Sequence, residues 1–219
     1  MSTLSQEKGV HILGPQFSTF VRSVQLCCEE KSIPYTLGMS INGNAIDLHS
    51  SEHLRINPFG KVPILLHGEH QLCETASICR YLDEAFEGYQ LQPEAAWERA
   101  LVDQFSAWLS IYVDEAIVRR YLLEFYFPKG ENGTVRKDYI RAAEPEVARM
   151  LSLLELQLTK QPYLVTESFS VADALAAPML DYLSKLPPAV PLLQKTPHLS
   201  AYLKRIQDRP SARNVFVVA

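Results

Sequence analysis

The hydrophobic pattern of the chain changes once, near Gly88. Before that point, short apolar runs alternate with segments whose apolar residues recur every three or four positions, which predicts strands alternating with helices. Beyond it, every apolar pattern has helical spacing. Because 219 residues are enough for two small domains, we predict an α/β domain at 1–88 and an all-helical domain at 93–219, with the boundary near 87–93.

The first part predicts the order strand, helix, strand, followed by two strands and a helix. Val10–Leu13 is the first strand, and the helix after it begins behind Ser18 and is ended by Pro34. Tyr35–Ile41 is the second strand, and the polar, Gly- and Asn-rich stretch that continues to Pro58 is predicted to be a loop. The remaining apolar positions predict a hairpin and a helix: Val62–Leu66, Gln71–Cys73, and Ile78 to Phe86.

The second part predicts four helices by their apolar spacing. The first is a long amphipathic helix marked by aromatic residues, and the second is marked by aliphatic residues. The third opens with Ser170 and Asp173 at the spacing of a capping box, and the fourth is again marked by mostly aliphatic residues. The marking residues are, in chain order, Trp97, Leu101, Phe105, Trp108 and Tyr112; Val147, Leu151, Leu154 and Leu158; Leu175, Met179 and Leu183; Leu199, Tyr202, Leu203 and Ile206.

Charge and composition exclude several classes of function. A formal net charge of −4 without any basic run does not attract a phosphate backbone, so nucleic acid is not an expected partner. No stretch approaches the roughly 18 apolar residues of a membrane span, and the start of the chain lacks the pattern of a signal peptide. The four cysteines have neither redox-pair nor zinc-ribbon spacing, so we expect reduced packing residues, no metal and a cytoplasmic location.

Ser18 and Thr19 stand where the first predicted strand gives way to a helix. Free backbone N–H groups and the helix dipole favour a negative group at this position, and a hydroxyl donor adds a charge-assisted hydrogen bond. A thiolate held there would have a lowered pKa. The simpler alternative is that Ser18 is only the N-cap of the helix.

Two further positions could contact a ligand. Pro63, after Val62, cannot donate to a sheet ladder, so it indicates an edge strand, a cis turn or merely a strand start. Glu74 and Thr75 begin the next helix, where they can face a ligand or simply cap the helix. The long loop also carries three cationic candidates that could meet a carboxylate or be solvated: His49, His53 and Lys61.

Four segments in this order resemble the cytosolic glutathione transferases, and together they cover nearly the whole chain. They are Gly14-Pro15-Gln16-Phe17-Ser18-Thr19-Phe20-Val21-Arg22-Ser23-Val24; Asn57-Pro58-Phe59-Gly60-Lys61-Val62-Pro63; Glu74-Thr75 before Ile78 and Tyr81-Leu82; and Phe169-Ser170-Val171-Ala172-Asp173 with Ala177-Pro178. The resemblance implies a thioredoxin-like N-terminal domain, a helical C-terminal domain, and glutathione as co-substrate.

The resemblance also implies roles for the residues of the motifs. Ser18 would hydrogen-bond the glutathione sulfur, as in serine-type classes such as phi and tau and their bacterial-style members, with Thr19 as substitute. The other glutathione-binding residues would be Val62 by its backbone before a cis Pro63, Glu74 and Thr75 at the γ-glutamyl end, and Lys61 and His49 at the glycyl carboxylate. His49 departs from the lysine often found in the family.

The expected reaction is attack of the glutathione thiolate on an apolar electrophile, a detoxification chemistry. The walls of the electrophile pocket are predicted to include Phe20, Tyr112, Arg119 and Tyr121. Isomerisation, dehalogenation or peroxidase chemistry would use the same thiolate, and a cysteine-type thiol–disulfide activity or a non-catalytic carrier are further alternatives.

The resemblance implies a homodimer. The helix after Glu74 and Thr75, with Arg80, Tyr81 and Asp83, would pack against the partner's long helix that carries Trp97, Phe105 and Trp108. A contact of this kind must be self-complementary about a twofold axis.

Overall fold

The computed structural model of the protein describes residues 9–216, which form two compact units. Unit 1 contains the described residues up to Gln92 together with those from Ser211, and unit 2 is Pro93–Pro210. The domain ranges 1–88 and 93–219 stay a prediction, and the units differ from them in assigning the segment from Ser211 to unit 1.

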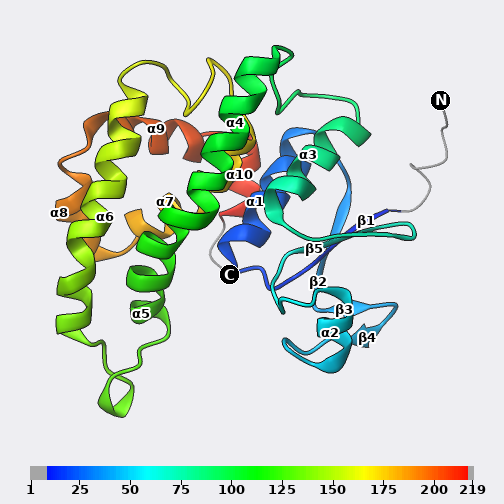
Figure 1. Ribbon diagram of the computed structural model, residues 1–219, viewed down its shortest axis with the longest axis horizontal. Coiled ribbons are helices and arrows are strands. Elements are labelled where there is room, and N and C mark those ends of the chain that lie inside the picture. The colour runs from blue at the N-terminus through cyan, green and yellow to red at the C-terminus, as the bar shows by residue number, and fades with distance from the viewer. Residues whose placement is uncertain (1–8, 217–219) are drawn as a thin grey trace. The chain divides into compact units, whose positions relative to one another are not determined.

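Unit 1 has the predicted thioredoxin-like order of strands and helices (Figure 1). Its sheet has the strand order β2-β1-β5-β6, with β1 and β2 parallel and the other neighbours antiparallel. The elements are β1 Val10–Leu13, α1 Thr19–Glu30, β2 Tyr35–Gly38, β3 Ser40–Ile41, β4 Asn44–Ala45, α2 Ser51–Ile56, β5 Ile64–His67, β6 His70–Leu72 and α3 Thr75–Ala85.

The stretch predicted as a loop before Pro58 is partly regular, so that prediction was wrong. It contains strand β4 and helix α2, and β4 pairs with β3, which together with β2 divides the predicted single strand Tyr35–Ile41 into two. Ser50 caps α2 by accepting a hydrogen bond from the backbone N–H of His53. A helix of six residues is too short to show a 3.6-residue period, which is why the sequence pattern did not reveal it.

Each face of the sheet in unit 1 is covered by different segments. Helices α1 and α3 pack together, and α1 contacts β1 (Figure 1). On the other face, Leu13 and Ile64 of the central strands pack with Ile46 from the segment before α2. Cys27, Cys28 and Cys79 are buried in this unit and Cys73 is half-buried, and all four thiols are free, as predicted.

The end of the described chain returns to unit 1 as α10, Pro210–Val215. The Ser211 hydroxyl donates a hydrogen bond to Glu30, and the Asn214 amide donates one to Glu29 at 2.7 Å. Both carboxylates stand at the C-terminal end of α1. The last segment of the chain therefore belongs to the packing of the first unit.

Among the described residues of unit 2, all regular secondary structure is helical, as predicted for the second part. Its segments are α4 Ala96–Trp108, the π-helical η1 Leu109–Leu122, α5 Leu123–Tyr126, the 3₁₀ turn η2 Glu131–Gly133, α6 Lys137–Leu158, α7 Val171–Ser184, the 3₁₀ turn η3 Pro187–Ala189, α8 Val190–Leu193 and α9 Pro197–Gln207. Helices α6 and α7 both pack against η1 (Figure 1).

The long predicted helix exists, running through α4, η1 and α5, and the aromatic residues that mark it are divided between the core, as Phe105 is, and the surface. Trp97 is 75% exposed and Tyr112 58% exposed, whereas Val102, Leu109 and Val113 are buried. A helical period shows which residues share a face, and it does not show which face meets the core when two faces carry apolar side chains.

The predicted capping box at the start of α7 is confirmed. The Asp173 carboxylate accepts hydrogen bonds from the backbone N–H and the hydroxyl of Ser170, each at 2.8 Å. It also accepts one from the Leu164 N–H and one from the Tyr202 hydroxyl, both at 3.0 Å. Burial raises the pKa of Asp173 and these donors oppose that shift. One carboxylate thus joins α7, α9 and the segment before α7.

Within residues 9–216, no helix combines the length and the apolar character required to cross a bilayer.

Candidate functional site

The register of the sheet brings three segments of unit 1, far apart in the sequence, to the same end of the sheet. Leu13, the last residue of β1, pairs with Ile64, the first residue of β5. Leu65 in turn pairs with Leu72, the last residue of β6. Consequently three segments lie at the same end of the sheet, beside the ends of its strands: the turn that leads to Ser18, the Val62–Pro63 segment, and the start of α3 at Glu74.

Gly14 shows how closely the first two of these segments approach. A Cβ atom at this glycine would collide with the Val21 side chain on α1 and lie 3.4 Å from the Cβ of Val62. Only a residue without a side chain allows the turn after β1 to pack against both neighbours. The two segments therefore form one surface.

Ser18 is the N-cap of α1, as the simpler sequence interpretation predicted. Its hydroxyl oxygen accepts a hydrogen bond from the Val21 N–H at 3.4 Å, and its side chain is half-buried. The first turn of α1 contains no acidic residue. Because a hydroxyl can accept one hydrogen bond and donate another, capping does not prevent Ser18 from donating to an anion at this helix N-terminus. Thr19, the first helical residue, is buried.

Arg22 holds the turn before Ser18, a function that the sequence did not reveal. Its guanidinium Nε donates to the backbone oxygen of Gln16 at 3.0 Å, and the residue is buried. The Ser18 N–H also donates to Pro15 at 3.0 Å. The spacing of Arg22 one helical turn after Ser18 is the only sequence signal that could have suggested this contact.

The peptide bond between Val62 and Pro63 is cis. Of the alternatives left open by the sequence, the cis turn is confirmed and the edge strand is wrong, because β5 lies between β1 and β6. The preceding residue, Lys61, has an exposed side chain, while its backbone oxygen accepts from the Asn57 amide at 2.9 Å.

Glu74 does not cap α3 through its side chain, so the capping interpretation is wrong for this residue. Its backbone is left-handed, with φ 68° and ψ 112°, and its side chain is exposed and makes no hydrogen bond to the helix N-terminus. A non-glycine residue in a sparsely populated conformation costs about 1–3 kcal/mol and often marks a ligand site. Thr75 beside it is buried.

His49 and Lys61 are joined through a third residue, His53, which we expected to be a candidate for solvation. His53 is completely buried, with 0% of its surface exposed. Its Nδ1 lies 3.0 Å from the backbone nitrogen of His49 and its Nε2 3.3 Å from the backbone oxygen of Lys61. Sequence spacing could not show this, because the ring reaches backbone groups on both sides of a turn.

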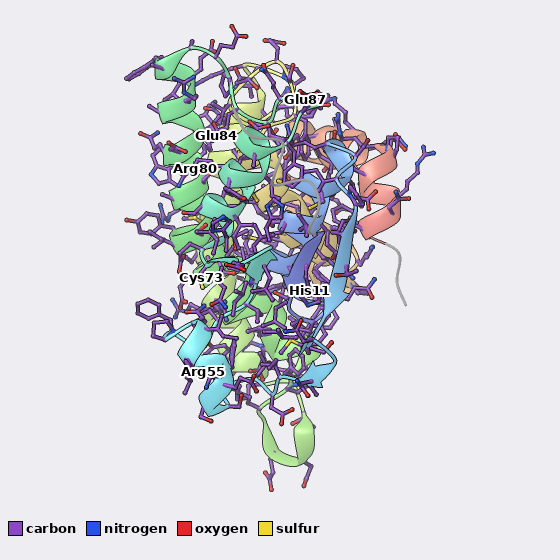
Figure 2. The ribbon with its side chains drawn as sticks, turned by 90° about the vertical axis from the view of Figure 1, so that its right-hand side faces the viewer. His11, Arg55, Cys73, Arg80, Glu84 and Glu87 are labelled. Carbon is purple, nitrogen blue, oxygen red and sulfur yellow. The ribbon has the colours of Figure 1, made fainter. Side chains whose placement is uncertain are left out.

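The start of α3 is also tied to α2. The Cys73 thiol points to the Ile56 oxygen at 3.9 Å, and Figure 2 shows Cys73 between Arg55 of α2 and Arg80 of α3. Burial raises the pKa of Cys73, with the Glu74 charge as a smaller cause. These contacts bring the loop with His49 and the Glu74 segment to the same part of unit 1.

The predicted electrophile-pocket residues are distributed over both units. Phe20 is a half-buried residue of α1 in unit 1. In unit 2, Tyr112 lines a cavity of about 250 Å³ with Glu115 and Arg120, whereas Arg119 is paired with Asp114 at 2.8 Å. Tyr121 is fully buried against the Phe125 ring, and burial raises the pKa of its hydroxyl.

A separate groove of about 590 Å³ lies in unit 1 near His11, which Figure 2 labels. Its lining includes Thr36, Ser40 and Gln71 and none of the predicted site residues. Within the described part of the chain, the His, Cys, Asp and Glu side chains form no group of three or more that could hold a metal ion.

Comparison with known proteins places both parts of the chain in one family. Residues 14–90 match the model described as "Glutathione S-transferase, N-terminal domain", and residues 115–210 match "Glutathione S-transferase, C-terminal domain". The protein "Glutathione S-transferase F10" of Arabidopsis thaliana is 27% identical over 213 residues, covering 93% of this chain and 94% of its own.

Solved structures agree with this. Glutathione transferase F7 of Populus trichocarpa is 25% identical, covers 94% of this chain and 97% of its own, and has a TM-score of 0.82. A theta class glutathione S-transferase from the citrus canker pathogen Xanthomonas axonopodis pv. citri, with glutathione bound, is 26% identical, with coverages of 97% and 99% and a TM-score of 0.80.

Proposed function

The chain belongs to the glutathione S-transferase family and is a glutathione transferase, and we propose that it activates the glutathione thiolate at Ser18 for attack on an apolar electrophile. The observation that carries the proposal is the convergence, at one end of the sheet, of the Ser18 hydroxyl, the Val62 backbone and the left-handed, exposed Glu74. The sheet register brings these three segments together.

The tripeptide would extend along this end of the sheet. The backbone of Val62 would pair with the cysteinyl unit, whose sulfur would meet the Ser18 hydroxyl. The γ-glutamyl end would meet Glu74 and Thr75, and the glycyl carboxylate would meet His49 and Lys61. The exposed Glu74 carboxylate, which does not cap its own helix, supports the assignment of the γ-glutamyl end.

Thiolate formation follows from the N-terminal position of Ser18 on α1. Unpaired N–H groups and a hydroxyl donor stabilise sulfur as an anion and lower the thiol pKa. The protein then contributes position and charge stabilisation while the thiolate attacks. The proposed walls of the electrophile pocket are Phe20, Tyr112, Arg119 and Tyr121; within unit 2, Arg119 is paired with Asp114 and Tyr121 is buried.

The serine-type assignment is favoured over a cysteine-type activity. Burial raises the pKa of Cys28 well above its ordinary value, and a hydrogen bond with Cys79 together with burial does the same for Cys27. Reactive thiols need the opposite shift. A serine-type, phi-like enzyme of cytoplasmic detoxification is consistent with the plant relatives named F, whereas isomerase, dehalogenase or peroxidase use of the same thiolate is the second candidate.

The test of the function is capture on immobilised glutathione followed by turnover with aryl halides, epoxides, enones and hydroperoxides. Capture with conjugation of any of these supports the proposal. Capture without turnover on the whole panel would indicate a carrier, and failure of capture would remove glutathione as the ligand.

Replacing Glu74 by alanine is expected to raise the glutathione KM by about 10- to 100-fold, because a charged hydrogen bond to the γ-glutamyl ammonium contributes about 1.5–3 kcal/mol. Steady-state kinetics with varied glutathione measures this. Glu167→Ala, at an exposed position of unit 2 outside the proposed binding residues and the proposed dimer contact, is the control and should leave KM unchanged. A normal KM in Glu74→Ala with a lower melting temperature would assign Glu74 a structural role.

We also propose a homodimer, supported by the exposed Trp97, whereas Phe105 of the same predicted face is buried against the Trp108 ring. Two residues named for the opposing face act inside unit 1 instead: the Tyr81 hydroxyl lies 2.8 Å from His67 Nδ1, and Asp83 accepts from Lys31 at 3.0 Å. On α3 we therefore propose Arg80 and Glu84 for the contact (Figure 2).

Light scattering is expected to give twice the 24.8 kDa of one chain at micromolar concentration, since stable interfaces bury about 1,200–2,000 Å². Trp97→Glu should lower the mass, whereas Leu156→Glu at another exposed apolar position should not. A single-chain mass with full activity in the unaltered protein contradicts the dimer.

A further inference from the structure

The buried imidazole of His53 has a defined protonation pattern. The backbone nitrogen of His49 can only donate, so Nδ1 of His53 accepts its hydrogen bond at 3.0 Å. The neutral ring then carries its proton on Nε2, which donates to the backbone oxygen of Lys61 at 3.3 Å. Since His53 is 0% exposed, both bonds are shielded from water.

Of the two residues that His53 holds, His49 has an unusual backbone conformation. His49 has φ 65°, a left-handed conformation that a side chain rarely adopts without support. Its ring lies at 61° to the ring of His53, with centroids 6.2 Å apart. Gly60 makes room for it, because a Cβ atom there would lie 2.6 Å from Nδ1 of His49.

The backbone oxygen of Lys61 accepts two side-chain hydrogen bonds, whereas the backbone N–H of His49 donates to His53. The Lys61 oxygen accepts from His53 and also from the Asn57 amide at 2.9 Å. Asn57 is buried, and its side-chain oxygen Oδ1 accepts a hydrogen bond from the Phe59 N–H at 3.1 Å. The His49 N–H donates its hydrogen bond to Nδ1 of His53. Loss of the Nδ1 acceptor should therefore disturb His49 more than loss of the Nε2 donor disturbs Lys61.

We propose that His53 is the positioning residue that makes this enzyme discriminate the tripeptide glutathione from thiols without a glycyl carboxylate. The inference rests on the proposed function, in which His49 and Lys61 meet that carboxylate. His53 does not touch the ligand. It fixes the backbones of His49 and Lys61, so that binding of the carboxylate does not have to order the backbone of this turn.

Two substitutions separate the two hydrogen bonds. His53→Gln places an amide N–H near the position of Nε2 and removes the acceptor at Nδ1, whereas His53→Asn places an oxygen near Nδ1 and removes the donor to Lys61. The readout is KM and kcat with glutathione and with γ-glutamylcysteine, which has the same γ-glutamyl and thiol groups but no glycyl carboxylate.

His53→Gln is expected to raise the glutathione KM about tenfold and to leave KM for γ-glutamylcysteine and both kcat values within about twofold. His53→Asn should raise the glutathione KM less, because Asn57 still holds Lys61. If His53→Gln does not fold, Gly60→Ala is a second route that leaves the His53 side chain in place: at φ 60° the added methyl strains the Gly60 backbone beside Lys61 and displaces the His49 ring. It should show the same selective loss.

Glu74→Ala and Ser18→Ala distinguish failure of this inference from failure of the proposed function, because the first should weaken both thiols alike and the second should slow both. Suppose that both control variants behave as expected, but that His53→Gln raises KM equally for glutathione and γ-glutamylcysteine or changes neither KM. The positioning role of His53 is then overturned, while the proposed glutathione site remains supported. If neither control affects either thiol, the site itself is wrong, and the inference fails with it.

Discussion

Replacing Ser18 by alanine is expected to lower kcat by about 10²- to 10³-fold while changing the glutathione KM little. A hydroxyl directed at developing charge in a preorganised site contributes this much to the rate, whereas the rest of the tripeptide is held elsewhere. The measurement is steady-state kinetics with an aryl halide, together with the ultraviolet absorbance of the enzyme-bound thiolate as a function of pH. The thiolate signal should appear at higher pH in the variant.

Two further variants separate catalysis from capping, since Ser18 also caps α1 and loss of a cap costs about 1 kcal/mol. Ser18→Asp keeps a strong cap without a hydroxyl donor and should be stable but inactive. Ser18→Thr keeps both and should retain most activity. If Ser18→Ala were as active as the unaltered enzyme and Thr19→Ala were inactive, Thr19 rather than Ser18 would be the residue that contacts the glutathione sulfur. Full activity in both alanine variants would leave the helix N-terminus alone as the activator.

The order of elements in the fold could be predicted because it depends on local information. Periods of two and 3.6 residues, proline and glycine positions, and the Ser170–Asp173 capping spacing are all read within one segment, and the structure has the order of strands and helices and the cap that they predict. The errors arose where segments were too short for a period, as in α2 and in the division of Tyr35–Ile41 between β2 and β3.

The candidate site was predictable to a smaller extent, for a physical reason. The position of Ser18 at the N-terminus of α1 follows from a strand–helix transition, which is a local pattern. The burial of His53 and the left-handed backbone of Glu74 depend on how the loop folds against the sheet. Such contacts join groups whose spacing in the chain has no fixed period, so motif resemblance was needed to suggest the residues, and geometry was needed to suggest the role of His53.

The largest stability effect is expected for Asp173→Ala. The buried carboxylate accepts four hydrogen bonds, and its removal leaves the Ser170, Leu164 and Tyr202 donors without that acceptor inside unit 2. Each buried donor left unsatisfied costs about 1–3 kcal/mol. A loss of at least about 3 kcal/mol is a large fraction of the roughly 5–15 kcal/mol that stabilises a typical protein, so thermal unfolding should shift downward by about 6–12 °C.

The matched control for Asp173→Ala is Asp208→Ala. Asp208 pairs with Lys204 at 3.5 Å on the surface of α9, and its side chain is 58% exposed, so its loss should change stability by less than about 0.5 kcal/mol. Ser170→Ala should fall between the two, because it removes one of the four donors and leaves the carboxylate bound by the other three. Differential scanning calorimetry of the three variants gives the ranking directly. If Asp173→Ala melted with Asp208→Ala, the carboxylate would not join α7 to α9 in solution, and the stability of unit 2 would have to come from its apolar packing alone.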